Sequence, residues 1–373
     1  MTKSTFTWKH FFYLFIILCT NTIFTRCKKE DHSNHDDDSH THGIPVPYTP
    51  YAVYVAEEEE GKITVINPVE NKTIGSITIS DHHSSSSLAL MPHNVQVAPD
   101  GKSVWVTGTA HDSGGTEQVI VIDPVANHSI VKRIDVGINQ HLGHIVLDSA
   151  SNYAFVTANE ADQVVQINSK TYTEVKRFNL GAAHGPHGLR YLRGNLYVAN
   201  MEAKSLSIIN ISSGQITEIP LGGMAVQTAV TSDGKYVFIS LYDTKEIARY
   251  DIQSQQISKI TLPGGSLGPI QLYPTPDNQL LYVCDQGAVG GDPASNKVYV
   301  IDIASSSVTD TIVAGYATHG VVVSNDGKKA YITNSLSNTV SIIDVTTQTV
   351  TNTIHVGKTP NGISYRFPTG GMQ

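Results

Sequence analysis

Histidine is the residue type that gives this chain its most evident chemistry. Sixteen of the 373 residues are histidine, and imidazole nitrogens bind Zn, Cu and Ni or serve as axial ligands of a metallocofactor. Four lie at or beside the start of apolar segments that we interpret as inner strands of a repeated unit: His93, His144, His187 and His319. Five more lie in the loops next to such starts: His82, His83, His111, His141 and His184. We take these nine as candidate metal-binding residues.

Other residue types narrow the kind of metal. Only three Cys and five Met are present, which disfavours Cu(I) and iron–sulfur chemistry and leaves Zn, Cu or a metal-containing cofactor, of unknown identity. A histidine at the start of a strand can also simply bond a neighbouring backbone, and for any single histidine we favour that structural role. Such a structural role does not explain the five loop histidines, so the nine histidines taken together favour a metal-binding site.

The segments that must position these histidines belong to a sequence repeat. Its clearest copies read PHNVQVAPDGKSVWVTGT from Pro92, AVQTAVTSDGKYVFISLY from Ala225 and THGVVVSNDGKKAYITNS from Thr318. Alternating apolar and polar residues indicate strands. Aligned copies give equivalent positions separated by 50, 44, 39, 44, 49 and 42 residues, the period of four-stranded propeller blades. The equivalent positions are His93, Gly143, His187, Val226, Ile270, His319 and Asn361.

The two ends of the repeat complete each other. The segment from Tyr51 lacks an inner strand, whereas residues 359–367 are one strand left over after the last copy. Pairing these two pieces would close the ring and remove exposed sheet edges. We therefore predict an all-β fold, a seven-bladed β-propeller over residues 51–367 whose first blade is closed by N- and C-terminal strands, followed by a tail over 368–373.

Loop lengths distinguish the two faces of such a ring. On one face the connections are tight turns built on Asp-Gly or Pro, which local backbone chemistry explains. The other, here called the first face, carries the connections from one blade to the next and holds the insertions at 80–91, 108–117 and 286–296. Long loops on a rigid scaffold are where binding residues tend to lie. The nine candidate histidines map to the same face as these insertions, so we place the site at the first-face end of the channel.

The order of blades makes this channel mouth asymmetric. Inner-strand histidines come from blades seven, two, three and four, and Asn361 of blade one lies between them. Blades five and six offer Val226, Gln227, Ile270 and Gln271 instead. A metal would thus lie off the axis, with an apolar side that could face an organic ligand.

The N-terminal segment is a targeting signal. Lys3, Lys9 and His10 precede a short apolar run at 11–19, so residues 1–26 read as a signal peptide. Cys27 lies where a lipoprotein signal would be cleaved, and we expect it to carry lipid. Residues 27–50 form a His- and Asp-rich tether that either binds metal loosely or serves as a solvated spacer. The expected location is the cell envelope, at the outer membrane or cell surface.

Charge and motifs exclude several functions. With 25 basic and 33 acidic residues, a net charge of -8 and no long basic run, nucleic acid is not an expected partner. No GxSxG, Walker or HExxH motif occurs. Acidic candidates for a metal-assisted hydrolase lie on the same face, namely residues 57–60, Asp112, Glu160, Glu202, Asp285 and Asp292. Their spacing does not establish a catalytic base, so the sequence favours a binding protein over an enzyme.

Three strands carry a resemblance to a known family. The segments at 153–159, 196–200 and 330–334, read YAFVTAN, LYVAN and AYITN, resemble the YVTN (YncE-like) family of bacterial β-propellers. The resemblance extends over all blades and implies the fold. For function it implies three branches: exported binding proteins, including surface lipoproteins that work with an outer-membrane transporter; propellers that hold copper clusters or haem d1 through channel histidines; and lactonase-like enzymes.

The sequence therefore predicts an exported, lipid-anchored, monomeric propeller domain that binds a metal ion or metal-containing cofactor at a His-rich channel mouth. One alternative is a protein-interaction scaffold, or a surface binding protein associated with uptake, without bound metal. Another is a lactonase-like or metal-assisted hydrolase. In the first alternative the histidines are structural, and in the second a carboxylate near the site is essential for turnover.

Overall fold

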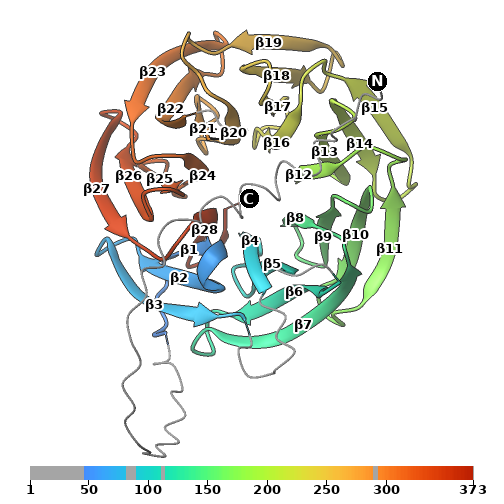
Figure 1. The fold of residues 1–373 in the computed structure, drawn as a ribbon, viewed down its shortest axis with the longest axis vertical. Coiled ribbons are helices and arrows are strands. Elements are labelled where there is room, and N and C mark those ends of the chain that lie inside the picture. Colours follow the sequence, from blue (N-terminus) through green and yellow to red (C-terminus); the bar gives the residue numbers. More distant parts are fainter. Residues whose placement is uncertain (1–45, 81–89, 111–113, 289–292, 373) are drawn as a thin grey trace, which may run out of the picture.

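The fold is a closed ring of seven antiparallel sheets (Figure 1). The structure is a computed structural model, and it describes residues 46–80, 90–110, 114–288 and 293–372. The predictions for Cys27, His82, His83 and His111 lie outside these residues. Within them there is no α-helix, and one 3-10 turn, η1 (Glu58–Glu60), follows the first strand. The predicted all-β seven-bladed propeller is confirmed.

Blade one contains strands from both ends of the chain. Its order is β29 (Gly370–Gly371), β28 (Pro360–Phe367), β1 (Ala52–Glu57), β2 (Lys62–Asn67) and β3 (Lys72–Thr78). The innermost long strand, β28, pairs antiparallel with β1, with Val53 opposite Tyr365. Figure 1 shows this blue and red sheet joining the first and last parts of the chain. The predicted closure is confirmed.

The other six blades each use four consecutive strands, and the first of each is the inner strand. The first three of these blades contain β4 (Leu90–Val97), β5 (Val104–Ala110), β6 (Thr116–Asp123) and β7 (Ser129–Ile138); β8 (Leu142–Leu147), β9 (Tyr153–Ala158), β10 (Gln163–Asn168) and β11 (Glu174–Asn179); β12 (Pro186–Leu192), β13 (Asn195–Asn200), β14 (Ser205–Asn210) and β15 (Ile216–Pro220). The last three contain β16 (Ala225–Val230), β17 (Tyr236–Leu241), β18 (Glu246–Asp251) and β19 (Ile257–Thr261); β20 (Pro269–Pro274), β21 (Leu280–Gly287), β22 (Ala294–Asp302) and β23 (Ser307–Val313); β24 (Thr318–Val323), β25 (Lys329–Asn334), β26 (Thr339–Asp344) and β27 (Thr349–His355).

The core lies between neighbouring sheets. Inner and middle strands are buried along almost their whole length, whereas outer strands such as β27 alternate between exposed and partly buried residues, with Ile354 buried. Both faces of a propeller sheet pack on neighbours, so these strands carry near-continuous Val and Ile. Cys284, on β21, is fully buried in this core, and burial raises the pKa of its thiol well above the ordinary value.

The first and last described residues pack against the ring. Val46 is buried, and its carbonyl accepts a hydrogen bond from His128 Nδ1 at 3.1 Å, so residues 46–50 are part of the domain and not of a free tether. At the other end the carbonyl of Met372 accepts a hydrogen bond from Gln96 Nε2 at 2.7 Å. Gln96 lies on the inner strand β4, and Figure 1 shows the C-terminal end near the middle of the ring.

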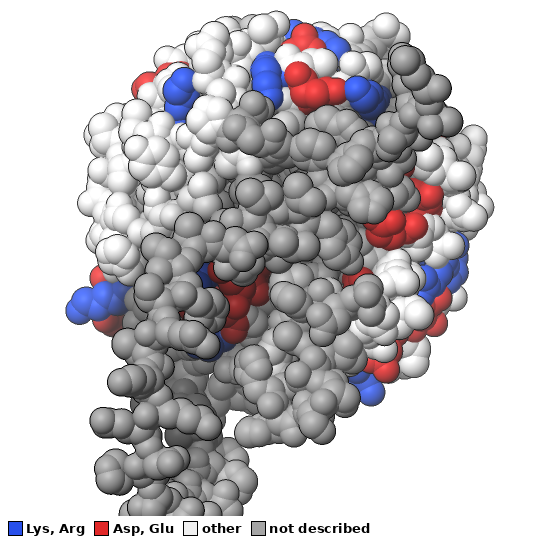
Figure 2. Space-filling model, viewed as in Figure 1, with Lys and Arg blue, Asp and Glu red and all other residues white. Residues whose placement is uncertain are grey.

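The visible surface is mixed in charge. In Figure 2, Lys and Arg lie singly or beside Asp and Glu, and no continuous basic area is seen between the grey atoms. The whole chain carries a net charge of -8. Among the described residues, no helix has the length and apolar character required to span a membrane.

Candidate metal centre

A β-bulge at the start of each inner strand determines where the histidines lie. In blades three to seven the pairing with the second strand skips two residues, for example between Leu142 and Ile145 on β8 and between Pro186 and Leu189 on β12. The skipped backbone is left without ladder partners, and the strand bends there. On β4 the pairing skips a single residue, His93, between Pro92 and Asn94. His93, His144 and His187 all lie in these bulges.

Hydroxyl groups of the second strands hold the bulges. Thr157 Oγ1 accepts a hydrogen bond from the His144 backbone N–H at 2.9 Å and donates to the carbonyl of His187 at 2.6 Å. Thr107 does the same one blade earlier, accepting from Asn94 N–H and donating to Gly143 O. Each hydroxyl thus joins the bulge of its own blade to that of the next. These bonds fix the spacing of the three histidines around the ring.

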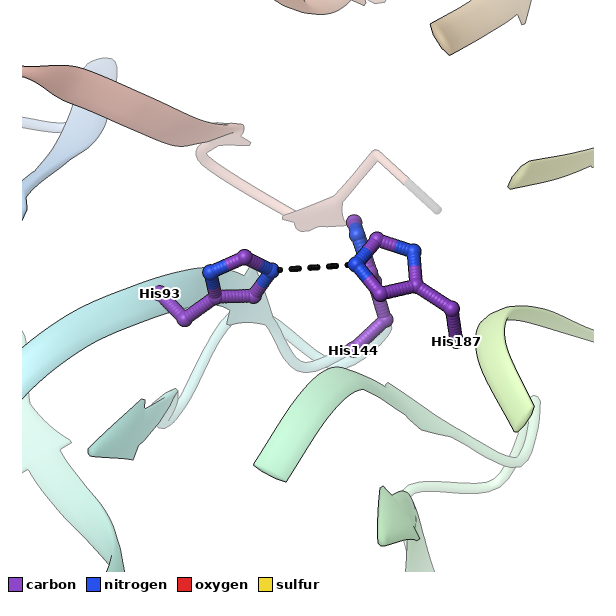
Figure 3. Close-up of side chains that lie close together, drawn as sticks. All are labelled: His93, His144 and His187. Atoms are coloured by element: carbon purple, nitrogen blue, oxygen red, sulfur yellow. Dashed lines mark hydrogen bonds between the residues drawn. The ribbon is translucent and has the colours of Figure 1, made fainter. Parts of the chain in front are cut away.

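The three side chains converge at the first-face end of the channel (Figure 3). One nitrogen from each of His93, His144 and His187 lies within 4.8 Å of the others, and all three residues are buried. Ring centroids are 4.9 Å apart for His144 and His187 and 5.4 Å apart for His93 and His187. The three come from adjacent blades, so the cluster lies to one side of the axis, in agreement with the asymmetric mouth predicted from the sequence.

Two of the nitrogens are already at the spacing of metal ligands. His93 Nε2 and His187 Nε2 lie 3.3 Å apart. Two nitrogens bound to one tetrahedral Zn at about 2.0–2.1 Å would lie roughly 3.3–3.4 Å apart. Only the third ligand, His144, would need to move closer to complete a shared coordination sphere.

The outer nitrogens of the same two rings are held by acceptors. His93 Nδ1 lies 2.6 Å from Glu58 Oε1, and His187 Nδ1 lies 3.0 Å from the carbonyl oxygen of Val226. A carboxylate and a carbonyl can only accept, so each Nδ1 carries a proton and donates. Both Nε2 lone pairs then point at each other, which is repulsive unless a proton or a metal ion lies between them. Histidines that bind a metal through one ring nitrogen commonly donate from the other nitrogen to a carboxylate or a carbonyl in this way.

The third ring is held in a different way. Gln227 Oε1 accepts a hydrogen bond from the Thr228 backbone N–H at 2.8 Å, which orients the amide so that Nε2 faces His144 Nδ1 at 2.9 Å. His144 Nδ1 therefore accepts, and the proton of the neutral ring lies on Nε2. For Nε2 of His144 to bind a metal, the Gln227 amide must rotate or the ring must change its tautomer. In the structure described, His93 and His187 are preorganised and His144 is not.

Burial keeps the rings of His144 and His187 neutral. Desolvation, with repulsion from His93 adding to it, lowers the pKa of His187 to about 3. Burial and repulsion from His187 lower the pKa of His144 well below its ordinary value. A neutral imidazole presents a lone pair, so these two side chains are in the ligating form at neutral pH.

Two further predicted histidines lie beside the cluster without joining it. His319 is buried and bonds Asn361; burial and repulsion from His93 hold its pKa well below the ordinary range. The His141 ring centroid is 6.4 Å from that of His93, and burial lowers the pKa of His141 to about 4. Asn361 Nδ2 in turn lies 3.3 Å from His93 Nδ1. These residues form the surroundings of the three-histidine group.

His184 lies outside the group. Its Nδ1 contacts the carbonyls of Gly181 and Ala182, and its Nε2 is 3.3 Å from a carboxylate oxygen of Glu218 on the outer strand. Among the acidic candidates, Asp285 has a structural environment: it is buried and accepts hydrogen bonds from the hydroxyls of Ser266 and Ser295 and from backbone N–H groups. Asp112 and Asp292 lie outside the described residues.

Comparisons with known proteins support the fold. No protein-family model matches the chain, and no curated protein matches it in sequence. A solved virginiamycin B lyase from Staphylococcus aureus with quinupristin is 16% identical with a TM-score of 0.62, covering 78% of this chain and 96% of that one. Hydrazine synthase from Kuenenia stuttgartiensis is 15% identical with a TM-score of 0.65, covering 76% and 94%. The dihydro-heme d1 dehydrogenase NirN in complex with DHE is 14% identical with a TM-score of 0.58, covering 85% and 65%.

At these identities the likeness shows the propeller fold alone. The structures with quinupristin and with DHE show what those proteins bind. The residues that carry function must be argued from the site itself.

Proposed function

We propose that this propeller binds a divalent transition-metal ion, Zn or Cu(II), through His93, His144 and His187. The observation that carries the proposal is the 3.3 Å separation of His93 Nε2 and His187 Nε2 with both Nδ1 atoms held by acceptors. Imidazole-only sites suit these metals. The arrangement favours a single ion over a macrocyclic cofactor, because an axial ligand of a haem does not need two further imidazoles on the same side.

The three-histidine group also bears on the alternatives. Three histidine ligands leave a fourth position open, as in zinc enzymes that activate water. Within the described part of the chain the group contains no carboxylate, and Glu58 already accepts from His93. A hydrolase would need a further base at the open position, so binding is the function that we favour. A scaffold without metal would need a proton between the two facing Nε2 atoms.

Export and anchoring complete the proposal. The signal sequence at 1–26 and Cys27 support a protein of the cell envelope, lipidated at Cys27 and held near the outer membrane or another surface protein such as a transporter. Incorporation of labelled palmitate, lost in Cys27→Ala, tests the anchor. Retention of the label in that variant would overturn it.

Metal content tests the site. The purified chain, stripped with EDTA, is titrated with Zn and Cu(II) in competition with a chromophoric chelator. We expect one tight equivalent that is lost in His93→Ala and His187→Ala and retained in His184→Ala, whose side chain lies outside the group. Binding that survives the first two substitutions would overturn the assignment. The tether histidines are removed by a second variant lacking residues 28–43, so that loose binding there is not counted.

A further inference from the structure

A second polar group lies deeper in the channel. In blades two, four and six the inner strand carries a polar side chain three residues after the equivalent positions His93, His187 and Ile270. These side chains are Gln96, Arg190 and Tyr273. The strand registers of β12 and β20 agree with this alignment, because Leu189 and Leu272 hold the same place in their ladders. Arg190 and Tyr273 are therefore at one level, below the histidines.

The side chains at this level meet across the channel. The guanidinium carbon of Arg190 lies 6.0 Å from the centroid of the Tyr273 ring, although the two strands belong to different, non-adjacent blades. Arg190 follows the proposed metal ligand His187 by three residues on the same inner strand, β12. At the same position of β4, Gln96 Nε2 donates to the carbonyl of Met372 at 2.7 Å.

These groups are donors without matching acceptors. Arg190 is 8% exposed, and its only hydrogen bond among the described residues runs from Nη1 to the adjacent Leu189 carbonyl at 3.0 Å; no described carboxylate pairs with it. Tyr273 OH and Gln271 Nε2 are buried and have no partner among the described residues. A buried cation and two buried donors without acceptors are costly, since each has lost its water.

We propose that Arg190, Tyr273 and Gln271 form a binding site for a small oxyanion in the channel, next to the metal centre. Guanidinium donates two parallel bonds to a carboxylate or phosphate, and the phenol and amide supply further donors. The anion restores the missing charge partner of Arg190. None of the three residues is a proposed metal ligand. The inference nevertheless extends the proposed function, because an anion bound here would attract a cation to the histidines.

Calorimetric titration of the EDTA-treated chain with acetate and, separately, with inorganic phosphate tests the site. Binding of either supports an oxyanion site, and the stronger of the two identifies its class. Tyr273→Phe, which retains the ring, should weaken binding about tenfold, the scale of one hydrogen bond to a charged group. Tyr299→Phe is the matched control, because it removes another buried hydroxyl on the middle strand β22 of the same blade and should leave binding unchanged.

Arg190→Met should abolish anion binding. If the Arg190→Met variant does not fold, Tyr273→Phe still tests the site. Absence of binding by both anions, or equal affinities of the two tyrosine variants, would overturn the site. The outcome is separate from that of the metal titration. Anion binding without metal binding would overturn only the proposed function, and metal binding without anion binding would overturn only this inference. If both bind, saturating anion should raise the Zn affinity several-fold, because it neutralises Arg190.

Discussion

His93 Nδ1 lies 2.6 Å from Glu58 Oε1, and this bond turns the opposite ring nitrogen toward His187. Glu58 lies in η1, directly after the first strand of blade one, whereas His93 belongs to blade two. The orientation of a metal ligand in one blade therefore depends on a carboxylate supplied by its neighbour.

Glu58→Gln should weaken metal binding without removing a ligand. The neutral amide is a poorer acceptor for Nδ1–H and reduces the basicity of His93, and loss of such an outer partner costs about 10–100-fold in affinity. Glu59→Gln is the matched control, because Glu59 is the exposed neighbour in the same turn. Chelator competition gives both affinities. Equal values for the two variants would show that Glu58 does not act on the site.

The sequence predicted the fold in detail because blades repeat. Aligning copies gave equivalent positions for His93, His187 and His319 that agree with the strand registers. It also indicated the side of the channel that would carry the metal. The sequence could not predict the direction in which each imidazole ring points. His319 has the same place in its blade as His187, yet it bonds Asn361 instead of joining the group.

The outer partners of the histidines were also beyond prediction. The acidic run at 57–60 was considered as a source of catalytic acids, and nothing in its spacing to His93 indicates that Glu58 orients a ring across a blade boundary. Val226 and Gln227 were expected to form an apolar side facing an organic ligand. In the structure the Val226 carbonyl and the Gln227 amide hold His187 and His144. Every residue has a backbone carbonyl, so the sequence does not show which carbonyl accepts from a histidine. The structure is needed to identify such a partner.

Gln227→Glu should tighten metal binding. A carboxylate at this position accepts from His144 Nδ1–H, so the ring adopts the tautomer that leaves Nε2 free as the third ligand. Because Gln227 is fully buried, the added charge should also lower the melting temperature of the metal-free protein. Chelator competition and thermal unfolding, each with and without Zn, measure the two effects. An affinity equal to or weaker than that of the parent chain would contradict the tautomer assignment.

Acidification should destabilise the metal-free protein below pH 6.5. The unfolded chain takes up a proton at each histidine near the ordinary pKa of 6.5, whereas the pKa of His187 is about 3 and that of His141 about 4 in the folded state. More protons are bound by the unfolded state in this interval, so the free energy of unfolding falls as pH falls from 6.5 toward 4. Each pKa unit of difference corresponds to about 1.4 kcal/mol when fully expressed.

Urea unfolding at a series of pH values measures this slope. His187→Gln should make it shallower, because one buried histidine is removed. His355→Gln, at an exposed position on β27, should leave it unchanged. Saturating Zn at pH 7 should raise the midpoint of the parent chain but not of His187→Gln. A slope that is identical in all three proteins would contradict the burial argument.

Arg366 should be important for ring closure. It is buried on β28, and its guanidinium donates to the carbonyls of Gly101, Thr49 and Pro50. Arg366→Met leaves these carbonyls without a donor, and we expect a loss of about 2–3 kcal/mol in the free energy of unfolding. Lys102→Met, an exposed charge in the adjacent turn, should change it by less than about 0.5 kcal/mol. Chemical denaturation measures both, and equal stabilities would show that the N-terminal residues are not held through Arg366.

Thr157→Val separates stability from the metal site. Valine keeps the shape of threonine but removes the hydroxyl that accepts from His144 N–H and donates to the His187 carbonyl. Thr333 makes the equivalent bonds in blade seven, to the Gly320 N–H and the Asn361 carbonyl. Each substitution should cost about 1–3 kcal/mol in the free energy of unfolding, because buried backbone groups lose a partner. Only Thr157→Val should weaken metal binding, since it alone frees the bulges that carry His144 and His187. Equal metal affinity in the two variants would mean that the hydroxyl bridge supports the ring without positioning the ligands.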